Sequence, residues 1–498
     1  MMSEGLPPLI RALLNPRCYP EPAATVDLVE THASWVLLAG SFAYKIKKPV
    51  VLPFLDYGTL DRRLACCSAE LQLNRRFAPD LYLEVVSIVD GHAGPQIGGS
   101  GKPLEYAVKM RRFAESGRLD RLCVHRHLFP EHISELGTAI ATFHQAAAVA
   151  PPASEFGRPE LVRAQVLDNF TELEALLPDG PIQAQLNSLA AWSLRDFTRL
   201  APQLAARRAG GRIRECHGDL HLGNLVLIGS RVRPFDCIEF SEVLRWIDVA
   251  SEIAFTYIDL LSHQQSALAG WFINEWLSAS GDYGALAVLR FYAVYRALVR
   301  AKIEAVRAAQ RSDEPSAASP YLALGLRLTQ ARARRLIITH GVAGCGKSRA
   351  ARRLVLHDAG ASTIRLRSDV ERKRLFGLAA TADSKSPVDR GIYSSEASER
   401  TYSRLHDMAA EALAHGWSAV VDAAFLERSW RERFHELAKS AGVPFHIVAP
   451  QASDAQLRAR IRRRSARGHD ASEASAAVLV RQMARIEGLT DQERRHLL

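Results

Sequence analysis

The segment 217–224, His-Gly-Asp-Leu-His-Leu-Gly-Asn, places an acid, an amide and two imidazoles within eight residues. Asp219 precedes Asn224 by five residues, and a second acid, Asp236, follows twelve residues after Asn224. In such a set Asp219 would orient or deprotonate a hydroxyl, whereas Asn224 and Asp236 would supply oxygen ligands to Mg2+ that bridges the phosphates of ATP. The segment therefore predicts a magnesium-dependent site for phosphoryl transfer.

The elements around this segment have to bring the two metal ligands together. Apolar residues 225–228 and 232–235 flank a short Gly-Ser turn, a pattern that predicts a β-hairpin. Such a hairpin would return the chain to its starting point and carry Asp236 back toward Asn224.

Two other interpretations of the same segment remain. A solvated turn could hold these residues by chance, or His217 and His221 could belong to a metal-dependent phosphohydrolase site. Neither alternative accounts for Asn224, the hairpin and Asp236 together.

Residues 217–224 resemble the catalytic loop of the aminoglycoside phosphotransferase-like kinases, a branch of the protein kinase-like fold. They keep the five-residue step of the kinase pattern H-R-D-x-x-x-x-N, with Gly218 in place of the Arg and His221 inside the loop. The resemblance implies an N-terminal α+β protein kinase-like fold of two lobes. It also implies that the second acid follows a hairpin, as Asp236 does, and that Asp248 braces the catalytic loop.

The resemblance also implies a strand lysine that neutralises the α- and β-phosphates and a helical glutamate that holds it. Lys45, in a strand expected after the Gly-Ser turn of residues 34–46, fits this lysine, and Lys47 on the same side of the strand is the fallback. Glu70, in a helix expected over residues 62–77, fits the glutamate. The alternative is a solvated strand end rich in lysine. No G-x-G-x-x-G loop precedes Lys45, which counts against a protein kinase.

A second phosphate site is predicted near residue 340. The apolar residues 336–339 predict a strand, residues 341–348 match the Walker A pattern, and residues 349–357 predict a helix. Backbone N–H groups of such a loop close round the β-phosphate, while the lysine reaches the β- and γ-phosphates and the serine ligands Mg2+. The expected nucleotide-binding residues are Gly341, Gly344, Cys345, Gly346, Lys347 and Ser348. A degenerate, empty loop is the alternative.

Acids follow two further predicted strands of this region. Asp369, with Arg372 three residues on, resembles the arrangement in the polynucleotide kinase, zeta toxin and gluconate kinase group. That resemblance implies that Asp369 activates the acceptor hydroxyl and that Arg372 binds an acceptor anion. The alternative for Asp369 is an N-cap of a surface helix. Asp422, at the end of the buried run 418–422, is expected to orient the Mg2+ shell. We expect a C-terminal α/β P-loop NTPase with a parallel sheet.

An arginine-rich helix is predicted over residues 457–472. The resembling kinases close a lid helix over ATP and donate an Arg to the transferred phosphate, and Arg460 and Arg464, four residues apart, share a helix face. Arg458 and Arg467 are rivals for this role. A solvated basic helix and an RNA-facing stripe are the alternatives, although no aromatic residues interleave these arginines.

The composition is that of a globular protein of more than one domain. The 498 residues are 48% hydrophobic and 24% charged, and the expected domains are residues 1–325 and 331–498. The formal net charge is +10, and its basic excess lies in the second range, which holds about 30 Lys and Arg against about 19 Asp and Glu. No signal peptide or membrane span is predicted, and the seven cysteines show no C-x-x-C pair, so we expect reduced thiols in the cytoplasm.

The two predicted sites indicate a bifunctional, ATP-dependent phosphotransferase with ATP and Mg2+ as cofactors and small-molecule hydroxyl groups as acceptors. Two alternatives belong to other classes. The C-terminal domain could be an ATPase switch or a nucleic-acid end kinase, and the N-terminal domain could be a pseudokinase scaffold. The sequence therefore predicts the chemistry of both sites and leaves the acceptors open.

Overall fold

The computed structural model divides the chain into two compact units. It describes residues 5–31, 33–52, 55–91, 94–178, 180–311, 315–384, 386, 390–467, 473 and 475–498. Unit 1 consists of residues 1–128, 146–162 and 205–256, and unit 2 consists of residues 129–145, 163–204 and 257–498. The predicted domains 1–325 and 331–498 stay a prediction, because unit 2 groups several helices of the first range with the second.

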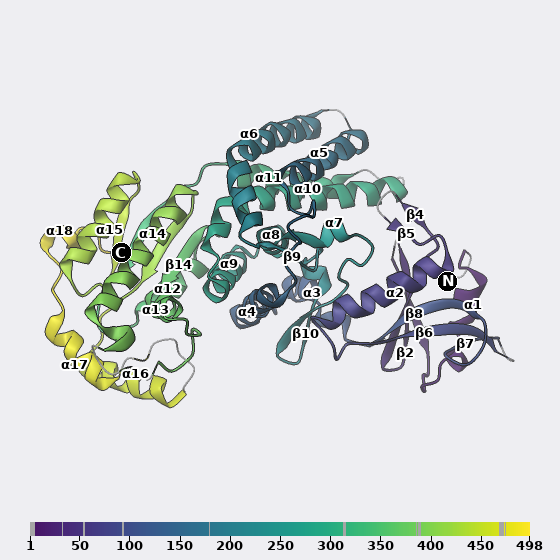
Figure 1. Cartoon of the computed structure of the whole chain (residues 1–498), viewed down its shortest axis with the longest axis horizontal. Coiled ribbons are helices and arrows are strands. Elements are labelled where there is room, and N and C mark those ends of the chain that lie inside the picture. Colours follow the sequence, from purple (N-terminus) through teal and green to yellow (C-terminus); the bar gives the residue numbers. More distant parts are fainter. Residues whose placement is uncertain are drawn as a thin grey trace. The chain divides into compact units, whose positions relative to one another are not determined.

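Unit 1 contains a six-stranded antiparallel sheet with the strand order β1-β2-β3-β8-β6-β7 (Figure 1). The expected turn joins β2 to β3, and a Cβ atom at Gly40, where φ is +55°, would lie 2.7 Å from the carbonyl oxygen of Pro22. Helix α2 confirms the helix predicted over residues 62–77, and it packs on β6 and β8. The bounds are α1 (Pro8–Ala12), β1 (Val26–Glu30), β2 (Ser34–Ala39), β3 (Phe42–Lys47), β4 (Val51–Leu52), β5 (Leu55–Asp56), α2 (Leu60–Arg75), β6 (Tyr82–Gly91), β7 (Gly94–Ile97) and β8 (Pro103–Arg111).

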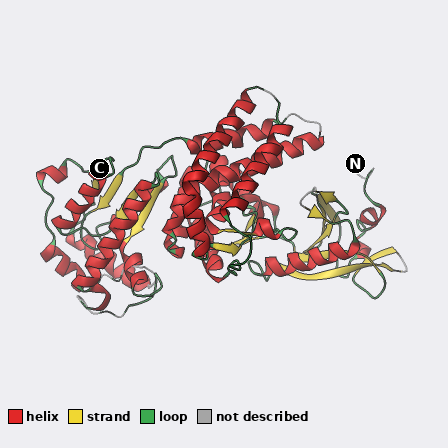
Figure 2. Ribbon diagram, turned by 45° about the horizontal axis from the view of Figure 1, so that its top comes forward, coloured by secondary structure: helices red, strands yellow, loops and turns green. Residues whose placement is uncertain are grey.

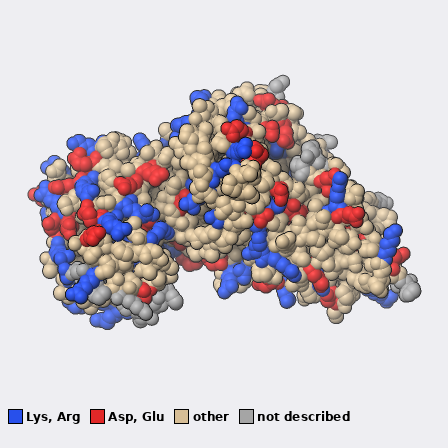
Figure 3. Space-filling model, in the orientation of Figure 1, with Lys and Arg blue, Asp and Glu red and all other residues tan. Residues whose placement is uncertain are grey.

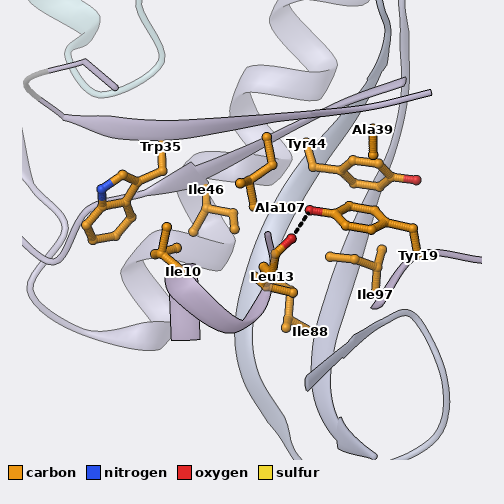
Figure 4. Packing of buried hydrophobic residues seen from close by; sticks show 11 residues of the cluster. Ile10, Leu13, Tyr19, Trp35, Ala39, Tyr44, Ile46, Ile88, Ile97 and Ala107 are labelled. Atoms are coloured by element: carbon orange, nitrogen blue, oxygen red, sulfur yellow. Dashed lines mark hydrogen bonds between the residues drawn. The ribbon is translucent and has the colours of Figure 1, made fainter. Parts of the chain in front are cut away.

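An apolar core fills one face of this sheet (Figure 4). Leu37 and Tyr44 are directly opposite each other on β2 and β3, both are 0% exposed, and they pack in one cluster with Ile10 and Leu13. The hydroxyl group of Tyr19 donates to the carbonyl oxygen of Leu13 at 2.8 Å, so its polar end is paired inside the core. This core holds the strand that carries Lys45 in place.

Replacing Leu37 by alanine should destabilise the protein by about 2–5 kcal/mol, because the change leaves a cavity in a closed core. Val29 on the neighbouring strand β1 is 38% exposed, so Val29→Ala should cost no more than about 0.5 kcal/mol. The midpoints of urea unfolding of the two variants measure the difference. Equal midpoints would show that Leu37 is not a core residue.

Short paired strands surround residues 217–224 in unit 1. The hairpin β10–β11 pairs Leu225 with Pro234 and Ile228 with Arg231, which confirms the predicted hairpin. The strand before the segment, β9, pairs with β12. The bounds are α3 (Leu119–Val124), β9 (Ile213–Glu215), the 3-10 helix η3 (Leu222–Asn224), β10 (Leu225–Ile228), β11 (Arg231–Pro234), α7 (Glu242–Arg245), β12 (Trp246–Asp248) and α8 (Val249–Ser262), whose second half belongs to unit 2.

Long helices make up the first part of unit 2. The polar, Pro-containing residues 311–320 predict a linker or loop, but helix α11 already begins at Ser319 and packs along α10 through a face that buries Leu322 and Leu328. Residues 312–314 of that prediction lie outside the described residues. The bounds are α4 (Pro130–Ala146), α5 (Pro159–Leu176), α6 (Pro181–Ala209), α9 (Ser266–Ser280), α10 (Leu286–Arg311) and α11 (Ser319–Thr329).

The rest of unit 2 contains a four-stranded parallel sheet with the order β14-β15-β13-β16, and its strands lie among helices (Figure 2). This arrangement confirms the predicted α/β fold with a parallel sheet. We call the part from β13 onward the P-loop domain. Its bounds are β13 (Leu336–Thr339), α12 (Lys347–Leu356), β14 (Thr363–Arg367), α13 (Ser368–Leu375), α14 (Ser395–Ala414), β15 (Ser418–Asp422), α15 (Arg428–Ser440), β16 (Phe445–Val448), α16 (Asp454–Arg467), α17 (Ala476–Arg485) and α18 (Asp491–Arg494).

The last residues of the chain add to the edge strand β16. Ile447 donates its N–H to His496 and accepts a hydrogen bond from the N–H of Leu498, at 2.8 and 3.1 Å. None of the described helices combines the length and the apolar composition that a membrane span requires.

Candidate active sites

Lys45, Glu70 and Asp236 meet in unit 1 as the sequence predicts. Lys45 on β3 points toward α2, where its Nζ lies 2.9 Å from Oε1 of Glu70, a carboxylate that is 0% exposed. The same ammonium group also contacts Oδ1 of Asp236. The structure therefore brings a strand lysine, a helical glutamate and the acid after the hairpin into direct contact.

A second lysine enters this cluster from the same side of β3. Lys47, which is 1% exposed, contacts the other carboxylate oxygen of Glu70 and also the carboxylate of Glu239. The hydroxyl group of Tyr57 donates to Glu239 as well. Lys47 was predicted from the sequence as a fallback for Lys45. Glu239 was missed, although its place three residues after Asp236 could have indicated it.

The charges of the cluster hold one another ionised. Burial alone would lower the pKa of Lys45, but the carboxylates of Asp236 and Glu70 outweigh burial and raise it. Burial would raise the pKa of Asp236, and the ammonium group of Lys45 lowers it below its usual range. Glu239 follows the same rule, because Lys47 outweighs its burial and lowers the pKa.

The predicted base Asp219 is held by Asn224. The Nδ2 group of Asn224 donates to Oδ2 of Asp219 at 2.9 Å and to the carbonyl oxygen of Asp219 at 3.0 Å. Nε2 of His221 lies 3.4 Å from the same carboxylate oxygen. The N–H of Phe235 donates to the carbonyl oxygen of Asn224 at 3.0 Å, so the hairpin returns Asp236 to Asn224 as predicted.

A buried glutamate that sequence reasoning missed braces the segment 217–224. The two carboxylate oxygens of Glu252, which is 0% exposed, accept the N–H groups of His217 and Gly218 at 2.7 and 2.8 Å. Asp248, to which this role was assigned by resemblance, instead accepts hydrogen bonds from Arg207 at 2.8 Å and from the N–H of Ala250. No motif marks Glu252, since it acts on residues 35 and 34 positions earlier in the chain.

Backbone geometry explains why Gly218 replaces the Arg of the kinase pattern. Its φ is +88°, and a Cβ atom there would lie 2.7 Å from the carbonyl oxygen of Leu244. Asp236 also has a positive φ, of +63°, a conformation that Asp and Asn tolerate better than other side chains. Its N–H donates to the hydroxyl oxygen of Tyr82, which fixes this turn.

Removing Lys47 should destabilise the protein far more than removing its neighbour Lys48. Lys47→Met leaves Glu239 buried without its ion-pair partner and Glu70 with Lys45 alone, a change that costs about 3–5 kcal/mol. Lys48 pairs with the exposed Glu30, and Lys48→Met should cost about 1 kcal/mol or less. The midpoints of urea unfolding of both variants measure this difference in stability. Similar losses of stability in the two variants would contradict the buried network.

The Walker A loop of unit 2 has the backbone that its glycines predict. Gly341, Gly344 and Gly346 have φ values of +133°, +84° and +112°, and a Cβ atom at Gly341 would lie 2.9 Å from Sγ of Cys345. The ammonium group of Lys347 lies inside the loop, 2.8 Å from the carbonyl oxygens of Gly341 and Val342. In the part of the chain that the structure describes, the N–H groups of Gly344, Gly346 and Lys347 donate to no acceptor.

Asp422 lies beside the P-loop, as expected of the acid at the end of β15. Its Oδ1 accepts the hydroxyl group of Ser348 at 3.1 Å. Its Oδ2 accepts Nε and Nη2 of Arg365, a buried residue of β14, at 3.0 and 2.5 Å. Arg365 was missed, because a charged residue inside a predicted strand carries no motif.

One cavity of about 370 Å3 joins the P-loop to the predicted acceptor residues. Asp369, at the start of α13, lines this cavity together with Arg372. Nη1 of Arg372 donates to the carbonyl oxygen of Ile392 at 2.9 Å and to Oγ of Ser398 at 3.2 Å, and its guanidinium lies over the ring of Tyr393. Asp369 and Arg372 therefore lie on one wall of the nucleotide cavity.

The predicted lid arginines differ in their placement. Arg460 on α16 donates from Nη1 to the carbonyl oxygens of Gly344 and Cys345 at 3.0 and 3.2 Å, so it contacts the backbone of the loop. The side chains of Arg464 and Arg467 lie outside the described residues. Two arginines of α17 line the cavity instead, and sequence reasoning missed them although they are four residues apart on one helix face: Arg481 and Arg485.

These two sites define the class of protein. Unit 1 has an aminoglycoside phosphotransferase-like kinase fold, in which the lysine, the glutamate and the two loops predicted from the sequence come together, and the P-loop domain has the fold of P-loop kinases. Both are folds of ATP-dependent phosphotransferases and imply ATP and a divalent metal. The family model of the AAA domain AAA_33 matches residues 336–489.

The chain is 30% identical over 429 residues to an uncharacterized protein of Mycobacterium tuberculosis (strain ATCC 25618 / H37Rv). The match covers 85% of this chain and 84% of the mycobacterial protein. The chain therefore belongs to the same protein family as that protein.

Two solved structures are similar to about two thirds of the chain. A choline/ethanolamine kinase family protein from Mesorhizobium loti has 15% sequence identity and a TM-score of 0.40, and the match covers 64% of this chain and 94% of that one. An aminoglycoside phosphotransferase from Alicyclobacillus acidocaldarius has 14% identity and a TM-score of 0.39, with coverages of 66% and 96%.

Proposed function

We propose that the protein is a phosphotransferase with two Mg-ATP sites, each of which transfers the γ-phosphoryl group of ATP to a hydroxyl group of a small molecule. The observation that carries this proposal is the completeness of each site. In unit 1, Lys45, Glu70, Asp219, Asn224 and Asp236 gather at one place. In unit 2, the P-loop, Asp369 and Asp422 line one cavity.

The residues of unit 1 suit a magnesium ion with a nucleotide. Asn224 and Asp236 bring oxygen atoms from two adjacent chain segments, and Mg2+ prefers such donors. Lys45 lies against Asp236 and adds the positive charge that the α- and β-phosphates require. When bound, the ion would neutralise charge that develops on the phosphates during transfer.

Asp219 is the base that we propose for unit 1. Its Oδ2 is held by the amide of Asn224 at 2.9 Å, so the carboxylate has a fixed orientation toward an acceptor hydroxyl. Glu252 fixes the backbone two residues before it through the N–H of His217. Proton acceptance by a positioned carboxylate contributes about 10²–10⁴-fold to the rate.

The P-loop domain suits the same chemistry with other residues. The N–H groups of Gly344, Gly346 and Lys347, which lack acceptors within the described residues, form a concave set of donors at the start of α12, and such a set binds phosphate. Ser348 and Asp422 would hold Mg2+ between them. Asp369 would take the proton of the acceptor hydroxyl, while Arg372 would bind an anionic group of that acceptor.

The same domain suggests arginines for the transferred phosphate. Arg481 and Arg485 line the cavity with Lys347, so we assign to them the role that the sequence gave to Arg460 and Arg464. Arg460 would then support the loop from outside through Gly344 and Cys345.

Small molecules are a better choice of acceptor than nucleic acid. Over the P-loop domain, on the face that Figure 3 shows, acidic side chains interrupt the basic ones, whereas a nucleic-acid site needs a continuous basic track. The seven free cysteines fit a reducing compartment, and we therefore propose the cytoplasm as the place of action.

Two variants should assign the two products. With γ-labelled ATP and a metabolite extract, Asp219→Asn should lower one labelled product by about 10²–10⁴-fold and leave the other unchanged. Lys347→Ala should do the reverse by about 10²–10³-fold, because it removes a cation from the phosphate site. Chromatography of the labelled products measures both effects.

Exposed residues of the same types provide the controls. Asp407 and Lys439 have side chains that are 82% and 74% exposed and lie outside the proposed sites, so Asp407→Asn and Lys439→Ala should leave both products unchanged. Wild-type protein that labels no small molecule, or a single product lost in both variants, would contradict two separate transfer sites.

A further inference from the structure

An asparagine of helix α9 completes the edge of the P-loop sheet. Asn274 is 3% exposed, and its Nδ2 donates to the carbonyl oxygen of Thr363 at 2.9 Å. Its Oδ1 accepts the N–H of Arg365 at 2.6 Å. The side-chain amide thus takes both hydrogen bonds that a neighbouring strand would make to residues two apart on β14.

β14 needs such a partner, because it is the last strand of the sheet on this side. Its outward N–H and C=O groups would otherwise be buried under α9, and an unpaired buried backbone group is costly. Helix α9 packs against β14 and α12, and Figure 1 shows these elements side by side. Asn274 is therefore the contact that satisfies the strand and fixes its position under the helix.

The pinned residue Arg365 reaches the metal site. From the strand position that Asn274 holds, its guanidinium binds Oδ2 of Asp422 through two nitrogens. Because Arg365 takes Oδ2, the other oxygen of Asp422, Oδ1, faces Ser348 and accepts its hydroxyl group at 3.1 Å. An unbroken series of contacts runs from helix α9 through a backbone N–H and a buried ion pair to the P-loop serine.

We propose that Asn274 is a positioning residue for magnesium at the P-loop site, acting through Arg365 on Asp422. The inference rests on the proposed function of that site, and it adds a residue outside the predicted domain 331–498. Arg365 would orient the carboxylate of Asp422, because hydrogen bonds from two guanidinium nitrogens fix the rotation of a carboxylate. Residues that hold a metal ligand in place without binding the metal typically change metal affinity by about 10–100-fold when they are replaced.

The helix next to α9 supports the same domain at a different place. Nη2 of Arg290 on α10 donates to the carbonyl oxygen of Gly416 at 3.0 Å, and Nε1 of Trp417 donates to Leu286 at 3.0 Å. These contacts lie before β15 and at the opposite end from Asp422. They make the P-loop domain and the helices one compact body, whereas Asn274 contacts the strand that carries Arg365.

The test compares ADP binding with Mg2+ and with EDTA by calorimetry, in full-length protein carrying Asp236→Asn. That background removes the metal carboxylate of unit 1, so the gain in ADP affinity on adding Mg2+ reports on the P-loop site. Asn274→Ala should reduce this gain by about 10-fold or more and leave ADP affinity in EDTA unchanged. An unchanged or larger gain, or an equal loss in both conditions, would overturn the proposal.

Asn169 on α5 is a matched control. Like Asn274, it is 3% exposed and donates from Nδ2 to the carbonyl oxygen four residues earlier, at 2.7 Å to Gln165 against 2.8 Å from Asn274 to Gly270. Asn169→Ala should lower the melting temperature as Asn274→Ala does and leave the Mg2+ gain unchanged. A reduced gain in the control as well would overturn the proposal.

Arg365→Lys decides the matter where Asn274→Ala does not fold. The lysine keeps the charge beside Asp422 and loses the two-nitrogen grip, so the Mg2+ gain should again fall. A gain equal to that of the Asp236→Asn parent would overturn the proposal. Failure of the parent to bind ADP at all would contradict the proposed function and not the role of Asn274.

Discussion

One fully buried carboxylate, that of Glu70, sets the construction of the site in unit 1. A carboxylate without water requires cationic partners, and Lys45 and Lys47 supply them because residues two apart on a strand point to the same side. Two cations on one anion need further negative charge, which Asp236 and Glu239 provide after the hairpin. A strand, a helix and the loop after the hairpin are thereby joined by charge, and none of them can move without separating buried ions.

The P-loop site also contains a buried carboxylate that requires partners, but other groups supply them. Asp422 is buried and divides its two oxygens between a cation, Arg365, and a hydroxyl group, that of Ser348. The loop itself depends on backbone conformation, since positive φ values at Gly341, Gly344 and Gly346 exclude larger residues. In both sites the predicted reactive groups are oriented by buried neighbours, Glu70 and Arg365, to which we assign no chemical role in the proposed transfer.

The sequence predicted those parts of the fold and sites that are local in the chain. The spacing from Asp219 to Asn224, the hairpin before Asp236 and the glycines of the P-loop fix their own geometry, and all of them have the expected form. Glu252 and Asn274 escaped prediction because each acts on backbone far away in the sequence, and no spacing rule reports such a contact. The extent of α11 was missed for a related reason, since apolar packing on α10 overrode the turn-forming residues before it.

The C-terminal residues that pair with β16 have a practical consequence. Together with Asn274 they leave neither edge of the parallel sheet open, and an open edge is a template for intermolecular β-pairing. A truncated fragment that begins at β13, or a chain shortened by its last few residues, would expose such a template. Aggregation during recombinant expression is the expected fate of either fragment, whatever the state of its nucleotide site.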